Sequence, residues 1–160
     1  MKKFIKWLFV ILVFLQAAVL IAGVVIFRMP LPDHDIDVSG LPLTDFVEVI
    51  RDERGIPHIY GTNVDDILFA QGYVHAQDRF WQLEFWSHLS TGRLASLIGE
   101  PGVGADLLFR TFGFNRVALE EYETLPPEFK QDLINYTDGI NAYIESRPQR
   151  SLSLEHFLLQ

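Results

Sequence analysis

The stretch Tyr73–Trp86, "YVHAQDRFWQLEFW", decides how the fold is interpreted, because it places charged residues among aromatic rings. On a helix, each row of side chains spaced three or four residues apart mixes apolar with polar residues. A helix without a clean polar face is normally buried. We therefore predict a largely buried helix in which Asp78, Arg79 and Glu84 hold neighbouring elements in register.

Charges on such a helix need partners, because an isolated buried ion costs several kcal/mol. No carboxylate lies three or four residues from Arg79, and only His75 at such a spacing offers Asp78 a positive charge. We predict that Asp78 and Arg79 both find tertiary partners. The nearest supply of charge is the preceding segment, with Arg51, Asp52, Glu53 and Arg54.

That segment, "FVEVIRDERGIPHIYG" (46–61), alternates apolar and polar residues on either side of a short loop that ends in Gly55. Such a loop between alternating runs predicts a β-hairpin. Pro57 cannot donate a ladder hydrogen bond, so the second strand is expected to pair on one side only at that point.

Helices are predicted for most of the remaining chain. Asn63 followed by Asp66 is typical of a helix N-cap, and the helix is expected from about residue 64 to 89, with a break at Gly72. A further turn is expected within 93–98. Two longer helices are predicted over about 105–122 and 126–146.

The N-terminal 28 residues predict a signal anchor. An uncharged run from Trp7 to Phe27 follows three lysines, and as a helix it measures roughly 31 Å, enough to cross the hydrocarbon core. The lysines favour a cytoplasmic N-terminus, which places residues 29–160 on the periplasmic or extracellular side of the cell membrane. Two alternatives stay open: a signal cleaved after Ala22 or Gly23, and a buried soluble helix.

Residues 29–45, which contain three prolines, predict an extended linker. Within it His34 lies between Asp33 and Asp35, which allows a metal site, although a solvated acidic linker is favoured. Residues 46–160 are expected to form the third region, an incomplete α+β domain with a β-hairpin followed mainly by helices. Without the four basic residues of the first 28, nine basic and 21 acidic residues remain, a formal charge of −12. This balance argues against a nucleic-acid partner.

Common catalytic patterns are missing: the chain has no G-x-S-x-G elbow, no phosphate-binding glycine loop, no H-E-x-x-H helix and no cysteine. His75 with Asp78, and Glu84 with His88, can each meet on a helix face. Ser87 points away from its neighbour His88, so a plain helical pair is favoured over a nucleophile and its base. Sequence patterns alone therefore favour no nucleophile–base pair in this chain.

Several motifs in order resemble the opening of the penicillin acylase (penicillin amidase) family. They are "VIRDERGIPHIYG" and "GYVHAQDRFWQLEFW", then "STGRLASLIGE", "YTDGINAYIE" and "LEHFLL", and together they run from about Phe46 to the C-terminus. The resemblance implies part of an N-terminal nucleophile hydrolase, whose fold is an αββα sandwich. Such enzymes are made as precursors that cut themselves into α and β chains, and the new N-terminal serine of the β chain attacks the amide.

The family's nucleophile is usually followed by Asn, and none of the seven serines here is: Ser39, Ser87, Ser90, Ser96, Ser146, Ser151 and Ser153. The resemblance implies that the nucleophile, the acyl pocket and a possible calcium site of the full-length enzyme lie outside this chain. We therefore predict that no catalytic, cofactor-binding or metal-binding residue lies in this chain. The expected partners are the remainder of the α chain and the β chain of one precursor, with the membrane at residues 7–27. A stand-alone anchored interaction module, or the product of a decayed gene, is the alternative.

Overall fold

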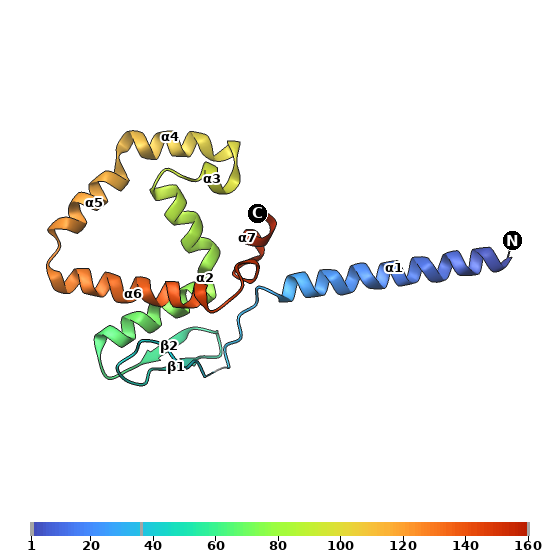
Figure 1. Cartoon of the computed structure of the whole chain (residues 1–160), viewed down its shortest axis with the longest axis horizontal. Helices are drawn as coiled ribbons and strands as arrows, with labels where there is room; N and C mark the ends of the chain where they lie inside the picture. Colours follow the sequence, from blue (N-terminus) through green and yellow to red (C-terminus); the bar gives the residue numbers. More distant parts are fainter. Residues whose placement is uncertain (1, 36, 160) are drawn as a thin grey trace.

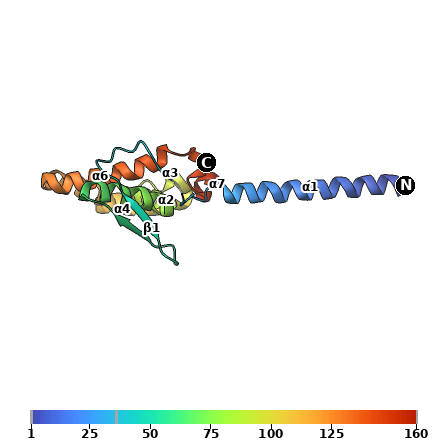
Figure 2. The same ribbon diagram turned by 90° about the horizontal axis from the view of Figure 1, so that it is seen from below.

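The computed structural model describes residues 2–35 and 37–159, which are mostly helical. The first helix, α1 (Lys2–Arg28), points straight away from the rest of the molecule (Figures 1 and 2). Its stretch Phe9–Arg28 has a mean hydropathy of 2.9, and none of that stretch is buried. The predicted apolar helix is therefore present and is not a buried core helix. Its length and composition suit a membrane span, as they also suit a signal sequence.

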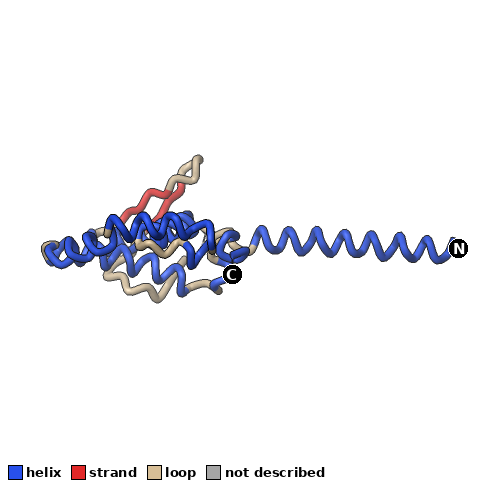
Figure 3. The backbone as a smooth tube through the Cα atoms, turned by 90° about the horizontal axis from the view of Figure 1, so that it is seen from above, coloured by secondary structure: helices blue, strands red, loops and turns tan. Residues whose placement is uncertain are grey.

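The predicted β-hairpin is confirmed. Strands β1 (Glu48–Arg51) and β2 (Pro57–Tyr60) pair antiparallel, with Glu48 opposite Tyr60 and Arg51 opposite Pro57. Gly55 has a φ of +77°, the left-handed conformation that glycine adopts without strain. Figure 3 shows the loop end of the hairpin projecting from the helical part of the molecule.

Helix α2 (Val64–Ser90) begins at the predicted cap, where the Asn63 side chain accepts a hydrogen bond from the Asp66 amide. The predicted break at Gly72 is wrong. The helix instead kinks at Arg79, which has φ −139° and ψ 28°. Gly72 serves a different purpose, the close approach of another helix.

The chain then continues through α3 (Ala95–Ile98), the 3₁₀ turn η1 (Glu100–Gly102), α4 (Val103–Phe112) and α5 (Phe114–Thr124). The single helix predicted over 105–122 is thus two helices, divided at Gly113, whose φ of +71° ends α4. Helix α6 (Pro127–Glu145) matches its prediction, and η2 (Gln149–Ser151) and α7 (Leu154–Leu159) follow.

The centre of the domain is the crossing of α2 and α6. A Cβ on Gly72 would fall on the Tyr136 carbonyl, and a Cβ on Gly139 would fall on the Phe69 carbonyl. Glycine at both positions therefore lets the two backbones touch. The core cluster lies beside this crossing, and it consists of Tyr73, Ala76, Phe80, Tyr143 and Leu152.

Helices α4 and α5, which we call the arm (residues 103–124), lie outside this core. Figure 1 shows them running from the end of α2 back to the start of α6. No residue of α5 is buried, and in α4 only Asp106 is. The arm exposes between 40% and 69% of each of seven apolar side chains: Val103, Leu107, Leu108, Phe112, Phe114, Val117 and Leu119.

Residues 29–45 have no regular secondary structure among those described, yet they lie against the domain, and we call them the strap. Leu41 packs on the core cluster. At the end of the strap, the backbone amides of Thr44 and Asp45 donate to the buried Asp66 carboxylate at 3.0 and 2.8 Å. The boundaries expected at residues 28 and 45 stay a prediction.

Candidate functional site

The polar residues of α2 that suggested chemistry meet the hairpin in one cluster. Arg51 donates to the Asp78 carboxylate through both terminal nitrogens, at 2.8 and 2.9 Å, and its second nitrogen also donates to Gln77 at 2.8 Å. Only 16% of the Arg51 side chain and 24% of the Asp78 side chain are exposed. The predicted tertiary partnership of Asp78 with the hairpin is confirmed, and its geometry is that of a bidentate ion pair.

The same prediction for Arg79 is wrong. Arg79 is exposed, and within residues 2–35 and 37–159 no hydrogen bond or ion pair joins its side chain to another. The buried side of α2 carries Tyr73, Ala76 and Phe80. Because Arg79 does not share that side, its guanidinium stays in water, where a charge needs no partner.

Burial of the opening stretch is confirmed only for its first half. Trp86, near the end of α2, exposes 63% of its surface. Trp81 and Phe85 are half-buried and contact each other, with ring centroids 6.1 Å apart. The second half of α2 therefore has fewer neighbours than its aromatic content led us to expect.

Glu84 binds a residue that the sequence pattern did not suggest. Its carboxylate lies 2.8 and 3.0 Å from His156 Nδ1, and the His156 ring packs edge-on against Phe80. The side chains are 15% and 9% exposed. This pair joins α2 to α7 and thereby closes the domain across 72 residues of sequence.

The expected helical pairs take other partners. His75 Nδ1 faces the Tyr136 hydroxyl of α6 at 2.5 Å, and His88 Nδ1 faces the Glu84 backbone carbonyl at 2.9 Å. Burial raises the pKa of the Tyr136 hydroxyl above its ordinary value. Neither histidine is hydrogen-bonded to a serine hydroxyl among the described residues, as activation of a nucleophile requires.

Two buried carboxylates, those of Asp66 and Asp106, accept hydrogen bonds from backbone amides and so hold the chain in place. Asp106 accepts from the Leu94 and Ala95 amides at 2.6 and 3.0 Å, at the start of α3. Asp66 accepts from the Asn63 side chain at 2.6 Å as well as from the strap. The hydrogen bonds from Asn63 and from the Thr44 amide hold the pKa of Asp66 below its ordinary value.

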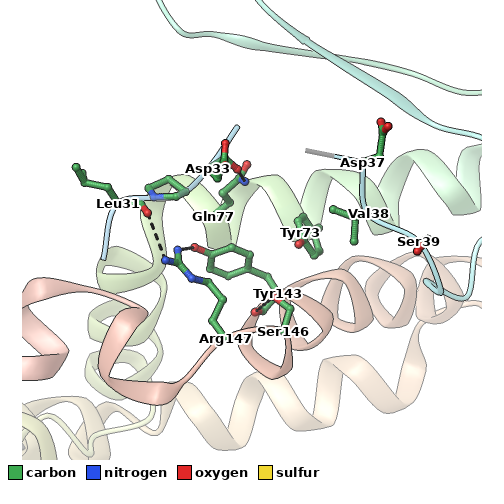
Figure 4. A pocket seen from close by; sticks show the side chains of 11 residues that line it. Leu31, Asp33, Asp37, Val38, Ser39, Tyr73, Gln77, Tyr143, Ser146 and Arg147 are labelled. Carbon is green, nitrogen blue, oxygen red and sulfur yellow. Dashed lines mark hydrogen bonds between the residues drawn. The ribbon is translucent and has the colours of Figure 1, made fainter. Parts of the chain in front are cut away.

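No group of three or more metal-ligating side chains gathers within residues 2–35 and 37–159. His34, where a metal site was the less favoured alternative, places Nε2 at 3.4 Å from Asp78 Oδ1. A groove of about 360 Å³ lies between the strap and the α2–α6 crossing (Figure 4). Its walls include Tyr73, Tyr143 and Arg147.

A family model described as penicillin amidase matches residues 46–160, most of the chain. The chain belongs to this family. The resemblance found in the motifs is therefore confirmed. The penicillin amidase match begins where the strap ends, just before β1.

Relatives in the penicillin amidase family include two enzymes of Pseudomonas. The chain is 40% identical to the penicillin acylase 2 proenzyme of Pseudomonas sp. (strain SE83) over 100 residues, 62% of this chain and 13% of the relative. It is 36% identical to the acyl-homoserine lactone acylase QuiP of Pseudomonas putida over 102 residues, 64% of this chain and 12% of the relative. The chain thus spans 12–13% of the length of these curated relatives.

Among solved structures, the chain is similar to a thermostable penicillin G acylase from Alcaligenes faecalis. The TM-score is 0.58 at 23% identity, and the match covers 71% of this chain and 69% of that one. The mostly helical fold with its two-stranded hairpin is therefore similar to the fold of the matched part of that penicillin G acylase chain.

Proposed function

We propose that residues 46–160 are the N-terminal scaffold of a membrane-anchored amidohydrolase that cleaves linear N-acyl amides. The relatives support this reaction class, since they are named as penicillin and acyl-homoserine lactone acylases. In this proposal the scaffold is part of an αββα sandwich, and the nucleophile is an N-terminal serine supplied by sequence outside residues 1–160. The chain alone is then inactive, and any calcium ion of the full-length enzyme is held elsewhere.

The observation that carries the proposal is the arm. Seven apolar side chains on α4 and α5 each expose at least 40% of their surface, although both helices belong to the matched region. An apolar surface of this kind marks a place where more protein packs. The partners that fit it are the remainder of the α chain and the β chain of the same precursor.

The polar pairs support the same interpretation. Arg51 with Asp78 joins the hairpin to α2, and Glu84 with His156 joins α2 to α7. Each pair links two elements, whereas a reaction centre needs a nucleophile, a base and oxyanion donors that converge on one point. Among the described residues the charged groups therefore act as scaffold.

For the location, we propose a single-pass anchor formed by residues 7–27 in the cell membrane. The helix α1 stands clear of the domain, and lysines at positions 2, 3 and 6 precede its apolar run. This arrangement favours the cytoplasm for the N-terminus and the periplasmic or extracellular side for residues 29–160.

The test has two parts. Residues 29–160 alone are assayed with benzylpenicillin and with an N-acyl-homoserine lactone. In parallel, residues 46–160 replace the matching stretch in the Pseudomonas sp. (strain SE83) proenzyme. We expect no hydrolysis by the isolated domain, whereas the chimera matures and hydrolyses penicillin.

A chimera with residues 46–160 in reversed order serves as the matched control, and it should neither mature nor hydrolyse. Hydrolysis by the isolated domain that is lost when one of its own serines becomes alanine would overturn the proposal. A chimera that stays unprocessed, while the parent proenzyme matures, would count against a scaffold role.

A further inference from the structure

Arg147 holds the first residues after α1 against the end of α6. Its Nη2 atom donates to the carbonyls of Met29 and Leu31, at 3.2 and 3.3 Å, and its Nη1 atom donates to the Tyr143 hydroxyl at 2.7 Å. Figure 4 shows the guanidinium between the strap and the Tyr143 ring. Tyr143 is only 2% exposed, so the clamp is built on the core. The planar guanidinium makes these bonds in a rigid fork.

The strap is held at further points along its length. Gln77 donates to the Asp33 carbonyl at 3.0 Å, and His34 lies against Asp78. Leu41 then packs on the core, and Asp66 binds the amides at the end of the strap. A flexible tether would instead be solvated along its length. The strap therefore fixes the orientation of the domain relative to α1.

One end of the domain consequently lies next to the C-terminal end of α1. Figures 1 and 2 place α7 beside the end of α1, while α6 extends away from that point, and Figure 3 also marks the C-terminus close to the end of the long N-terminal helix. Arg28, the last residue of α1, and Arg150, in η2 just after α6, are both exposed. Guanidinium groups bind phosphate oxygens through paired hydrogen bonds.

We propose that the end of α6 together with η2 is a membrane-docking surface, and that Arg147 keeps it against the phospholipid headgroups with Arg28 and Arg150 facing phosphate. This inference rests on the membrane anchor proposed above and adds an orientation to it. Since α6 has 19 residues, its far end stands roughly 28 Å further from the membrane.

The full chain in phosphatidylcholine vesicles tests this surface, because the chain has no cysteine and accepts a single label. A fluorophore is attached to Gln149→Cys in η2, just after α6, or to Glu128→Cys in the first turn of α6. Vesicles with and without a headgroup-linked nitroxide quencher are compared. We expect strong quenching at position 149 and little at 128. Arg147→Gln should remove most of that difference.

Arg54→Gln is the matched control, since it removes an exposed arginine of the hairpin loop and should leave the difference unchanged. Flotation of the vesicles separates the two proposals. A chain that fails to float with vesicles overturns the anchor and this inference together. A chain that floats with equal quenching at 149 and 128 overturns the docking surface alone. A difference that survives Arg147→Gln in a folded chain overturns the role of Arg147.

Discussion

The α2–α6 crossing and the arm are built from the same kinds of residue, yet only the crossing is packed. At the crossing, Gly72 and Gly139 let the backbones touch, and a core cluster rich in aromatic residues lies beside them. In the arm, α5 has no buried residue and its apolar side chains face outward. The difference separates a packed region, the crossing, from a region whose apolar side chains are exposed, the arm.

Glycine substitution should produce the largest contrast between the two regions. Gly72→Ala places a methyl group on the Tyr136 carbonyl, so the helices must separate, and we expect a loss of about 2–4 kcal/mol in unfolding free energy. Gly104→Ala in α4 meets nothing within 4 Å and should stabilise by about 0.5 kcal/mol. Denaturant unfolding of the full chain in detergent measures both. Equal effects at the two sites would contradict the comparison.

The role of Gly72 also shows what sequence patterns can and cannot reveal. The hairpin loop at Gly55 and the cap at Asn63 were predicted because each depends on residues a few positions away. Gly72 was predicted to break the helix, because a glycine inside a helical pattern is a local signal for a break. Its actual role is to leave room for the backbone carbonyl of Tyr136, which is far away in the sequence. Gly113 had a readable signal, a glycine at a helix end, but the apolar pattern ran through it.

For the charged pairs too, partners close in sequence were predicted and distant partners were not. The pairing of Asp78 with the hairpin was predicted because the hairpin is the nearest charged segment, and Arg51 is only 27 residues away. His156, the partner of Glu84, is 72 residues away and no local pattern points to it. For Arg79 the burial of the whole stretch was assumed, whereas only one side of the helix is covered.

Ion pairs should also differ between the packed region and the arm, but the difference in coupling free energy should be smaller than the difference expected for the glycine substitutions. A double-mutant cycle on Arg51 and Asp78, each changed to Ala, should show a coupling of about 1–2 kcal/mol, because the bidentate pair is mostly shielded from water. The matched cycle on Arg116 and Glu120 in α5, 70% and 63% exposed, should show about 0.3–0.5 kcal/mol. Unfolding free energies of the single and double variants supply both couplings. A coupling in the arm as large as that at the hairpin would refute the distinction.

Acid should lower the unfolding free energy of the packed region through Asp66. We expect this effect to be the smallest of those predicted here. The folded-state pKa of Asp66 lies below the ordinary value of 3.8, because the charged form accepts hydrogen bonds from Asn63 and the strap. Its contribution to stability is therefore complete above that ordinary value, and it is lost as the pH falls through the lower folded-state pKa. Asp66→Asn, which cannot titrate, should lose stability at pH 7 and show a smaller further loss between pH 5 and 3. Glu120→Gln in the arm controls for general charge effects. If Asp66→Asn is as acid-sensitive as the parent chain, the strap is not held by this carboxylate.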